Sequence, residues 1–454
     1  MDLLSGIAPV IGATLHGADV AFERVVTDTR DMRGGDLFLA IKGEHFDAHD
    51  FVGEARRHGA AAAIVSRRID DPLPQLLVGD TLHALASFGA HWRGRFQLPV
   101  VAVTGSNGKT TTKQMLASIF EARGPVLATL GNLNNHIGLP LTLLGLRPEH
   151  RTAVIEMGAN HLGEIGMLTG LTRPDVGVVT QAGDAHLEGF GSREGVARGK
   201  GELFQGLSGG IAAINMDDAY APLWRTLAQG ASIIGFGFGE SADVRAVNFQ
   251  PHPVRAPTGS EFELLTPSGR QAVRLPLPGR HNVHNALAAA ACAIALGVDL
   301  PDIAAGFARM EPAQGRLSWR TTPEGARLLD DTYNANPTSL RAGLELLASL
   351  PGERWAIVGA MAELGPDAAR LHYEAGQLAR ELGIDRLLAL GPLAAESARA
   401  FGAAGAAYDS VEELTAEARR GLRGGIAVLV KGSRSSRMER VVSALTGTAA
   451  GESH

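Results

Sequence analysis

The chain has 454 residues, of which 45% are hydrophobic and 20% are charged, and its formal net charge is −6. This length exceeds what one hydrophobic core supports, and the acidic balance argues against a broad nucleic-acid or membrane surface. The single cysteine, Cys292, fits a reducing compartment, and neither a signal-peptide pattern nor an apolar run of about 18 residues is present, so we expect a cytoplasmic protein without a membrane span.

Three blocks of alternating strand and helix patterns follow one another along the chain. The first, residues 1–82, predicts short strands at 36–41 and 60–65 with a helical stretch between them. The second, residues 83–312, predicts strands at 99–103, 152–157, 175–180, 211–215 and 232–236, then antiparallel strands within 243–277 and an Ala-rich helix over 282–296. The third, residues 313–454, predicts strands at 326–330, 355–358, 386–390 and 427–430.

These patterns predict an α/β protein of three domains. They are a small N-terminal α/β domain, a central domain with a mostly parallel sheet, and a C-terminal doubly wound domain that resembles a dinucleotide-binding fold. The third block contains no GxGxxG, so dinucleotide binding itself is not expected.

The stretch TGSNGKTTT, residues 104–112, directly follows the apolar strand PVVAV. A strand that ends in a Gly-rich turn and opens a helix forms a phosphate cradle, because backbone N–H groups and the helix N-terminus face the anion. Only the GKT half matches the usual motif, since Val103 stands where an earlier Gly is common. We expect this loop to bind a nucleoside triphosphate through Gly105, Ser106, Asn107, Gly108, Lys109, Thr110 and Thr111, with the Thr110 hydroxyl on Mg²⁺.

Polar clusters follow several other predicted strands. Glu156 ends an apolar strand, where a carboxylate is costly to bury without a partner, so it is either a Mg²⁺ ligand facing the phosphate loop or part of a structural salt bridge. His186 follows the next strand and is either a second metal ligand or an ordinary surface or core histidine. Lys200 lies on an amphipathic helical stretch, where a solvated lysine is the usual interpretation. Asn134 and Asn135, in GNLNNHIGLP, are either turn formers or the lining of a polar ligand site.

Two further clusters end strands of the third block. Tyr333 and Asn336, in DDTYNANPTS, suggest a ligand edge, and Lys431 and Arg434, in KGSRSSRME, suggest a basic anion site.

Taken together, these residues resemble the Mur ligase family, the ATP-dependent amide-forming enzymes of peptidoglycan precursor synthesis. The supporting stretches lie in all three blocks and in family order: TDTR (27–30), GDLFLAIKGEHFDAHDF (35–51), GNLNNHIGLP (131–140), IEMGANHLGEI (155–165), AHLEGFGS (185–192), LPGRHNVHNALAAA (277–290), DDTYNANPTS (330–339), MAELG (361–365) and KGSRSSRME (431–439). One departure is Ala360, where the family pattern leads us to expect Asp.

The resemblance implies a ligase that phosphorylates a carboxylate with ATP and Mg²⁺ and then joins an amine to it. The matched stretches agree best with the member that adds D-alanyl-D-alanine to UDP-N-acetylmuramoyl-tripeptide, and no DNPR stretch, typical of members that add a diamino acid or lysine, is present. We expect these small molecules to be its partners, with no nucleic acid, and we expect a monomer.

The resemblance also implies roles for individual residues. Lys109, His186 and Lys200 would be catalytic, and Thr110, Glu156, His186 and a carbamylated Lys200 would hold magnesium. His281 and Asn282 match the adenine-binding position, and Arg316 and Asp331 match contacts to phosphate and ribose. Thr29, Arg30 and Lys42 fall where the first domain would hold the UDP-sugar, and Asn134, Asn135, Tyr333, Asn336, Lys431 and Arg434 complete the expected substrate contacts.

Three other classes of protein remain open at this point. Folylpolyglutamate synthase shares the chemistry but would not be expected to carry this first domain. A P-loop switch or motor protein would hydrolyse nucleotide without a carboxylate substrate, although no NKxD motif is present. A non-catalytic nucleotide-binding scaffold would not need Glu156, His186 and Lys200 together.

Overall fold

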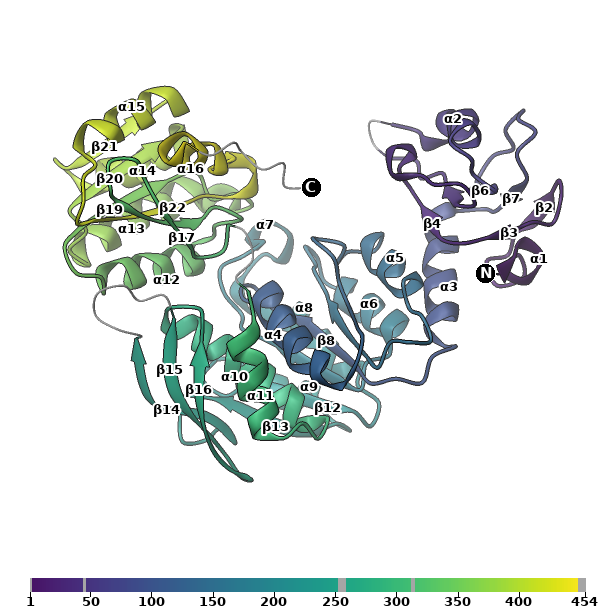
Figure 1. Ribbon diagram of the computed structural model, residues 1–454, viewed down its shortest axis with the longest axis horizontal. Helices are drawn as coiled ribbons and strands as arrows, with labels where there is room; N and C mark the ends of the chain where they lie inside the picture. Colours follow the sequence, from purple (N-terminus) through teal and green to yellow (C-terminus); the bar gives the residue numbers. More distant parts are fainter. Residues whose placement is uncertain (1, 44–45, 252–258, 312–314, 448–454) are drawn as a thin grey trace. The chain divides into compact units, whose positions relative to one another are not determined.

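The computed structural model describes residues 2–43, 46–251, 259–311 and 315–447 (Figure 1). The α/β fold class and the three-domain organisation predicted from the sequence are confirmed by separate sheets in the three parts of the chain. The domain boundary expected between residues 82 and 83 stays a prediction, and the one between 312 and 313 lies outside the described residues. Contacts divide the chain into two compact units, the first made of residues up to 102, 123–158 and 166–175, and the second of the remaining described chain.

The N-terminal domain is built on a small sheet with the strand order β2–β7–β6–β5–β4. β4 to β7 are parallel neighbours, and β2 is antiparallel to β7. The strands and helices of this domain are β1 (Asp2–Leu3), α1 (Leu4–Ile7), β2 (Thr14–His16), β3 (Ala21–Phe22), β4 (Val25–Val26), β5 (Leu37–Leu39), α2 (Val52–Arg57), β6 (Ala62–Val65), β7 (Gln75–Leu77) and α3 (Thr81–Arg93). One core face packs against α1 and α3 and the other against α2, so the apolar strands are covered on both sides.

The central domain contains a larger mixed sheet with the strand order β16–β15–β14–β13–β12–β11–β8–β10–β9. Its strands are β8 (Val100–Thr104), β9 (Val126–Ala128), β10 (Thr152–Glu156), β11 (Val176–Val179), β12 (Ile211–Asn215), β13 (Ser232–Gly237), β14 (Val244–Pro251), β15 (Ser260–Thr266) and β16 (Gly269–Leu275). The expected antiparallel strands within 243–277 are present, but β14 pairs in parallel with β13, so they extend the central sheet instead of forming a separate one. Residues 252–258 of that stretch lie outside the described residues.

Helices between these strands supply the cover that a buried sheet needs. They are α4 (Lys109–Phe120), α5 (Gly138–Leu144), α6 (Glu164–Thr172), α7 (Leu187–Phe190), α8 (Arg193–Gln205), α9 (Ala221–Leu227), α10 (Arg280–Ala295) and α11 (Leu300–Arg309). The alanines of α10 from Ala286 to Ala293 are buried, because this helix packs against α4, α11 and the sheet at once. A helix that is apolar on all sides is a core helix, and its small side chains allow its neighbours to approach closely.

The C-terminal domain has the strand order β17–β18–β22–β19–β20–β21, in which β18 to β22 are parallel neighbours and β17 is antiparallel. Its elements are β17 (Ser318–Thr321), β18 (Arg327–Asp331), α12 (Pro337–Ala348), β19 (Glu353–Val358), α13 (Ala368–Glu381), β20 (Arg386–Leu390), α14 (Pro392–Phe401), β21 (Gly405–Tyr408), α15 (Val411–Gly421), β22 (Ile426–Lys431) and α16 (Glu439–Thr446). α12, α13 and α14 cover one face, and α15 and α16 cover the other. This is the doubly wound arrangement that the sequence predicts.

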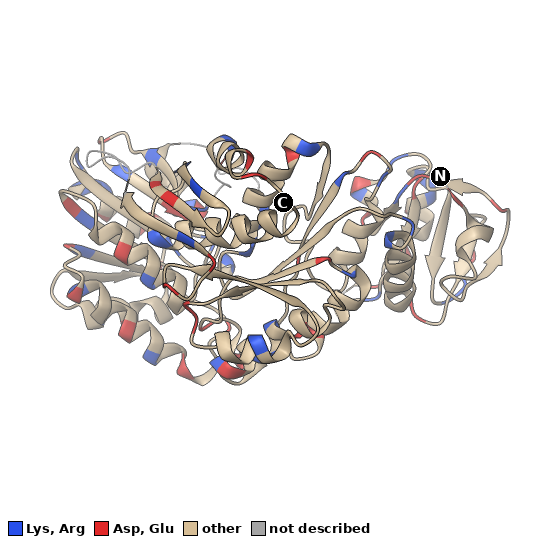
Figure 2. Cartoon of the chain, turned by 90° about the horizontal axis from the view of Figure 1, so that it is seen from below, with Lys and Arg blue, Asp and Glu red and all other residues tan. Residues whose placement is uncertain are grey.

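Charged residues of both signs are interspersed along the helices in Figure 2. Many form local pairs, such as Arg370 with Asp367 and Glu374 on α13 and Arg198 with Glu194 on α8. In the described part of the chain, no helix is both long enough and apolar enough to cross a bilayer.

We expect Leu429→Ala to destabilise the C-terminal domain by about 2–5 kcal/mol, because Leu429 is fully buried in β22 and its loss leaves a cavity. Leu393→Ala on α14, where the leucine is 39% exposed, is the matched control and should change stability by no more than about 0.5 kcal/mol. The measurement is calorimetric unfolding, read on the transition of the C-terminal domain because a multidomain chain does not unfold in one step. Equal shifts for the two variants would contradict this packing.

Candidate active site

The loop between β8 and α4 is shaped by two glycines. Gly105 has a φ of +137° and Gly108 a φ of +82°, which L side chains rarely adopt. A Cβ at Gly105 would lie 2.0 Å from Thr180 Oγ1, and one at Gly108 would lie 2.1 Å from Asn285 Oδ1. Both positions therefore require glycine for conformation and for space.

The end of β11 holds this loop in place. Thr180 Oγ1 donates a 2.6 Å hydrogen bond to the carbonyl of Asn107, and Ser106 N donates to the carbonyl of Gln181 at 2.9 Å. Gly183 N donates to Ser106 Oγ at 2.9 Å. Because no side chain caps α4 at its N-cap residue and its first turn carries no acidic residue, the helix N-terminus suits a phosphate group.

Two cations lie at this loop. Lys109 Nζ donates to the carbonyl of Gly105 at 2.8 Å, and Arg316 Nη2 donates to Thr110 Oγ1 at 3.0 Å. The guanidinium of Arg316 also lies 4.0 Å from the ring centroid of Tyr333. The phosphate loop thus has a lysine from its own helix and an arginine from the start of the third block, which suits the charge of a triphosphate. Thr111, which the sequence also assigns to the phosphate loop, is buried in α4.

Asn107 and Asn336 form a reciprocal amide pair. Asn336 Nδ2 donates to Asn107 Oδ1 at 2.8 Å, and Asn107 Nδ2 donates to Asn336 Oδ1 at 3.3 Å. Asn336 also caps α12, where its Oδ1 accepts from Ser339 N at 2.9 Å. The asparagine predicted as a substrate contact therefore fixes the start of α12 and joins it to the phosphate loop.

The residues predicted to bind adenine lie at the start of α10. Asn282 is buried, with Nδ2 donating to the carbonyl of Pro278 at 2.8 Å and Oδ1 accepting from Asn285 Nδ2 at 3.3 Å. Since Asn285 abuts Gly108, this chain of amides links α10 to the phosphate loop. Loss of water around the ring lowers the pKa of His281 to about 4, so this imidazole is neutral at physiological pH and suits an uncharged base.

At the carboxyl ends of β18 and β22, Asp331 and Lys431 neutralise one another. Lys431 is buried, and its Nζ donates to Asp331 Oδ2 at 2.5 Å and to the carbonyl of Asn334 at 2.9 Å. The lysine predicted for an open basic anion site is therefore already paired inside the domain. Arg434, predicted for the same site, lies in an exposed turn 3.6 Å from Glu439 Oε1.

Lys200 is fully buried in α8, which rules out the usual interpretation of a solvated helical lysine. Its Nζ donates to the carbonyl of Ala159 at 2.9 Å and lies 5.0 Å from the ring centroid of Phe190. Burial, and then the positive charge of Lys109, hold the pKa of Lys200 well below its usual range, although Glu164 and Glu202 oppose this shift. The structure thus favours the neutral amine.

His186, the N-cap residue of α7, has its Nδ1 in contact with a carboxylate oxygen of Glu363. This contact, assisted by Lys109, holds the pKa of the Glu363 carboxyl below its usual range. Lys109 therefore acts electrostatically on both Lys200 and Glu363. Lys109 thus lies within electrostatic reach of Lys200 and of the carboxylate that contacts His186, while the catalytic roles of Lys109, His186 and Lys200 stay predictions.

In the first unit, Glu156 lies at the carboxyl end of β10 and is 2% exposed. Its Oε1 accepts from Asn134 Nδ2 at 2.8 Å, and its backbone N donates to Thr129 Oγ1 at 2.9 Å. Asn135 Oδ1 accepts from Ile137 N and Gly138 N at 3.1 and 2.9 Å, so it stabilises the start of α5. Of the two predicted amides, Asn134 is therefore the one that orients the carboxylate.

The predicted sugar-binding residues of the N-terminal domain differ in exposure. Thr29 is buried, and its Oγ1 donates to Glu54 Oε1 at 2.7 Å. Arg30 is exposed and paired with Asp28, while Lys42 is exposed and its backbone pairs with that of Asp47 in an isolated antiparallel β-bridge. Their role in substrate binding stays a prediction.

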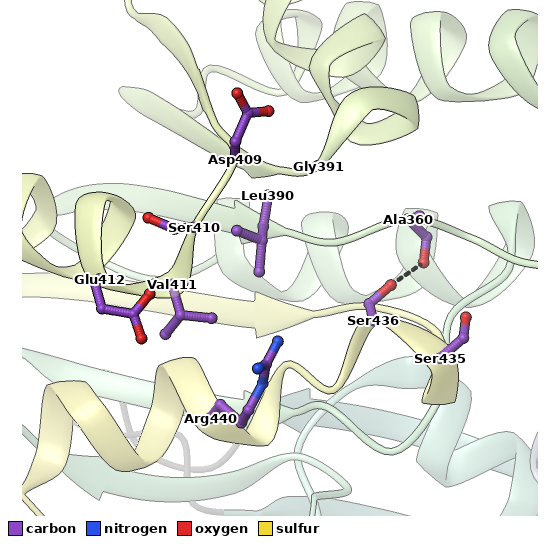
Figure 3. Close-up of a pocket in the computed structure, with 10 residues that line it drawn as sticks. All are labelled: Ala360, Leu390, Gly391, Asp409, Ser410, Val411, Glu412, Ser435, Ser436 and Arg440. Carbon is purple, nitrogen blue, oxygen red and sulfur yellow. Dashed lines mark hydrogen bonds between the residues drawn. The ribbon is translucent and has the colours of Figure 1, made fainter.

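An open surface pocket of about 430 Å³ lies on the C-terminal domain beside Ala360, the residue that departs from the expected Asp (Figure 3). It is lined by Ala360, Leu390, Gly391, Asp409, Ser410, Val411, Glu412, Ser435, Ser436 and Arg440. The carbonyl of Ala360 accepts from Ser436 Oγ at 3.0 Å and from Ser433 N at 2.8 Å. These bonds use the main chain, so an alanine at this position is compatible with the local fold.

The fold and this site define a nucleotide-binding enzyme of the phosphate-loop class. The model of the Mur ligase middle domain matches residues 103–293, that of the Mur ligase glutamate ligase domain matches 315–434, and that of the Mur ligase family catalytic domain matches 21–85. The chain belongs to the Mur ligase family and is an ATP-dependent ligase.

Relatives and solved structures agree over nearly the whole chain. A UDP-N-acetylmuramoyl-tripeptide–D-alanyl-D-alanine ligase from Escherichia coli is 44% identical over 97% of this chain and 98% of its own length. A crystal structure of MurF from Acinetobacter baumannii superposes with a TM-score of 0.91 at 37% identity, covering 99% of this chain and 100% of that one. MurF from Thermotoga maritima in complex with ADP gives a TM-score of 0.82 at 30% identity, covering 94% and 97%.

Sequence reasoning missed three residues at this site. Thr180 is the last residue of the predicted strand 175–180, and Asn285 and Glu363 lie within the quoted stretches LPGRHNVHNALAAA and MAELG. All three residues lie in stretches that the sequence analysis describes, but the residues that they contact, Gly105, Gly108 and His186, come from distant parts of the chain. Only the folded structure brings such pairs together.

We expect Gly108→Ala to abolish detectable nucleotide binding, because its Cβ would collide with Asn285 Oδ1 and the residue would be strained at φ +82°. Gly209→Ala is a matched control, since Gly209 has a φ of +72° but a Cβ there meets nothing within 4 Å. The measurement is ADP titration by calorimetry, together with circular dichroism to show that both variants fold. Normal ADP affinity in Gly108→Ala would contradict the assignment of this loop.

Proposed function

We propose that this chain joins D-alanyl-D-alanine to the terminal carboxylate of UDP-N-acetylmuramoyl-tripeptide, with ATP giving UDP-N-acetylmuramoyl-pentapeptide, ADP and phosphate in peptidoglycan precursor synthesis. The observation that carries this proposal is the 44% identity to a ligase of that name over 97% of this chain and 98% of the relative. That match includes the N-terminal domain. This domain would distinguish the substrate of the chain from the substrates of ligases that share only the ATP-dependent chemistry.

The first step transfers the γ-phosphoryl group of ATP to the tripeptide carboxylate, so that an oxygen–phosphorus bond forms and the bond to ADP breaks. A carboxylate is a poor electrophile, and the resulting acyl phosphate supplies a leaving group. The loop backbone, Lys109 and Arg316 would bind the phosphates, and the lysine would offset the charge that develops on the transferring group.

In the second step, the amine of D-alanyl-D-alanine attacks the acyl carbon. The tetrahedral intermediate then collapses as the carbon–oxygen bond to phosphate breaks, the amide forms and the amine loses a proton. An acyl phosphate is also open to hydrolysis, so the site must exclude water.

Magnesium would neutralise phosphate charge and orient the transferring group when it is bound. Within the described residues, no three His, Cys, Asp or Glu side chains gather closely enough to hold a metal on their own. Thr110, Glu156, His186 and Lys200 are the predicted ligands, but an ammonium at Lys200 would repel a cation. This donor set suits Mg²⁺, which prefers oxygen ligands, only if Lys200 carries a carboxylate.

Carbamylation would supply that carboxylate. A neutral lysine amine reacts with carbon dioxide to form a nitrogen–carbon bond and release a proton, and the product carries two oxygens and a negative charge. Burial keeps the Lys200 amine neutral, which favours this reaction. Placement in the same magnesium site stays a prediction for Glu156, which belongs to the first unit.

The remaining sequence predictions are part of the same proposal. His281 and Asn282 would bind adenine, Asp331 the ribose, and Thr29, Arg30 and Lys42 the UDP-sugar. Asn134, Asn135, Tyr333, Asn336, Lys431 and Arg434 would border the peptide and the acceptor. We also propose that the enzyme works in the cytoplasm as a monomer.

Lys200→Ala should lose at least about 100-fold in turnover, because it removes the oxygen ligands proposed for magnesium. Short carboxylic acids, added to fill the space, should restore part of this activity. Lys113→Ala, which removes another buried lysine of the central domain, is the control and should not respond to these acids. Activity is followed as ADP release, and intact-protein mass under native conditions should show 44 Da on wild-type Lys200, roughly the mass of one added carbon dioxide. Full activity in Lys200→Ala would contradict the proposed role.

The substrate assignment predicts that ADP forms only when UDP-N-acetylmuramoyl-tripeptide and D-alanyl-D-alanine are both present. Free D-alanine should be a poor acceptor, by on the order of 10⁴-fold in kcat/KM, since buried partners of the missing peptide group would be left unpaired. The measurement is ADP release with each substrate omitted in turn, plus the product mass. Equal turnover with folate and glutamate, or with hydrolysis alone, would contradict this function and favour the other classes considered above.

A further inference from the structure

We propose that His49 is a positioning residue for the UDP-sugar site of the N-terminal domain: it joins the end of β6 to Asp47 and thereby fixes the segment that pairs with Lys42. This inference rests on the proposed function, in which Lys42 contacts the UDP-sugar. The family resemblance assigns Thr29, Arg30 and Lys42 to that site and gives His49 no role.

The predicted sugar-binding residues lie at one edge of the N-terminal sheet. Thr29 and Arg30 follow β4, Lys42 follows β5, and Ser66 follows β6. β4, β5 and β6 are parallel neighbours, so their carboxyl ends lie side by side at this edge. Ligands of open α/β sheets bind outside the carboxyl ends of the strands. A contact made by Ser66 therefore lies beside the position expected for the substrate.

Both ring nitrogens of His49 form hydrogen bonds inside the domain. His49 is 2% exposed, and Ser66 N donates to its Nε2 at 2.8 Å. Because Nε2 accepts this bond, the proton of the neutral ring is on Nδ1, which donates to Asp47 Oδ1 at 2.5 Å. Asp47 Oδ1 also accepts from the backbone N of His49 at 3.0 Å. The imidazole thus bridges the end of β6 and the Asp47 carboxylate.

Asp47 in turn belongs to the segment that pairs with Lys42. The two residues form an antiparallel β-bridge, and Ala48 N donates to the carbonyl of Ile41 at 3.0 Å. The other oxygen of the carboxylate, Oδ2, lies 3.5 Å from Nη2 of Arg67, which also follows β6. Both carboxylate oxygens are therefore tied to the end of β6, and the backbone of Lys42 is aligned with the residue that they hold.

Asp47, His49 and Ser66 have the composition of a nucleophilic triad, but their geometry argues against that function. Ser66 Oγ lies 3.1 Å from His49 Nε2, yet the lone pair of this nitrogen already accepts the Ser66 N–H at 2.8 Å. A general base needs its lone pair free to take the hydroxyl proton. The ring therefore holds the main chain of Ser66 and does not activate its hydroxyl.

The first test measures hydrogen exchange at single amides in the complete chain without ligand, so it does not depend on turnover. His49→Ala removes the bridge, and exchange at Ala48 N–H should rise by at least about 10-fold as the paired segment opens. Ala48 N donates to Ile41 and not to the ring, so a change there reports the segment itself. A change confined to Ser66 N–H would overturn the inference, because the ring would then make a local contact only.

Calorimetric titration with UDP-N-acetylmuramoyl-tripeptide is the second test. In His49→Ala the Kd should rise by about 10-fold, because the buried partners of the ring are left unpaired and the segment is no longer held. The KM for this substrate should rise by the same factor, while kcat and the KM for ATP stay within about twofold. Asp47→Ala breaks the same bridge from a residue outside the core, so it gives the same result where His49→Ala does not fold.

Two conservative variants separate the bridge from other roles of its members. Asp47→Asn keeps an oxygen that accepts from the ring and caps the following turn equally well, so substrate affinity should stay within about threefold. Ser66→Ala keeps the main-chain donor and should also bind within about threefold. Labelling of Ser66 by a fluorophosphonate would overturn the inference, because the hydroxyl would then be an activated nucleophile.

Leu73→Ala is the matched control for a simple loss of stability. Leu73 is 5% exposed in a core cluster of the same domain, and its truncation leaves a cavity while the hydrogen bonds of the bridge remain. Its Kd for the substrate should stay within about threefold of the wild-type value. Equal losses of affinity in Leu73→Ala and His49→Ala would overturn the inference, because the ring would then act through stability alone.

Unchanged substrate affinity in a folded His49→Ala enzyme would also overturn the inference. So would a loss of about 10-fold in Asp47→Asn, since the charge of Asp47 would then act on the substrate directly. These outcomes leave the proposed function standing if the wild-type enzyme makes the pentapeptide. If the wild type binds no UDP-N-acetylmuramoyl-tripeptide, the proposed function fails, while exchange at Ala48 still decides whether His49 holds the segment beside Lys42.

Discussion

The backbone of the phosphate loop leaves no room for a side-chain carbon at Gly105 or Gly108, and much of the site follows from this constraint. Thr180 and Asn285 occupy the space that those carbons would fill, so the end of β11 and the start of α10 become the walls of the loop. Asn285 in turn donates a hydrogen bond to Asn282, and Asn107 accepts one from Asn336 at the start of α12, so these two residues also depend on the shape of the loop. The loop is therefore shaped by groups that come from three separate elements before any ligand is considered.

Charge is distributed around this loop in an equally specific way. Lys109 and Arg316 provide positive charge at the phosphate loop, whereas burial lowers the pKa of the second lysine, Lys200, and favours its neutral form. Glu363 balances Lys109 and contacts His186. A site that kept every lysine protonated would bind phosphate strongly but would repel the magnesium that phosphoryl transfer needs.

The sequence predicts accurately those elements of secondary structure that depend on a local pattern of residues. The strand–loop–helix over 99–121, the Ala-rich α10 and the alternating strands of the C-terminal domain each have a period or a turn signal that can be read directly. Short strands such as β9 and β21 were not predicted, because three or four residues carry too little periodicity. The parallel pairing of β14 with β13 also escaped prediction, since it depends on which sheet edge is available. The burial of Lys200 and Lys431, and the partnership of Glu363 with His186, could not be predicted because their surroundings come from distant segments.

The amide pair between Asn107 and Asn336 has a consequence for the response of the molecule to ionic strength. Both partners are uncharged, so counter-ions do not screen the contact, and no proton is gained or lost near neutral pH. The contact between His186 and Glu363 involves a carboxylate that salt can screen. Concentrated salt should therefore weaken the second connection between the phosphate-loop region and the C-terminal domain while the first persists. The nucleotide loop would keep its attachment to α12 under conditions in which the histidine has lost its partner.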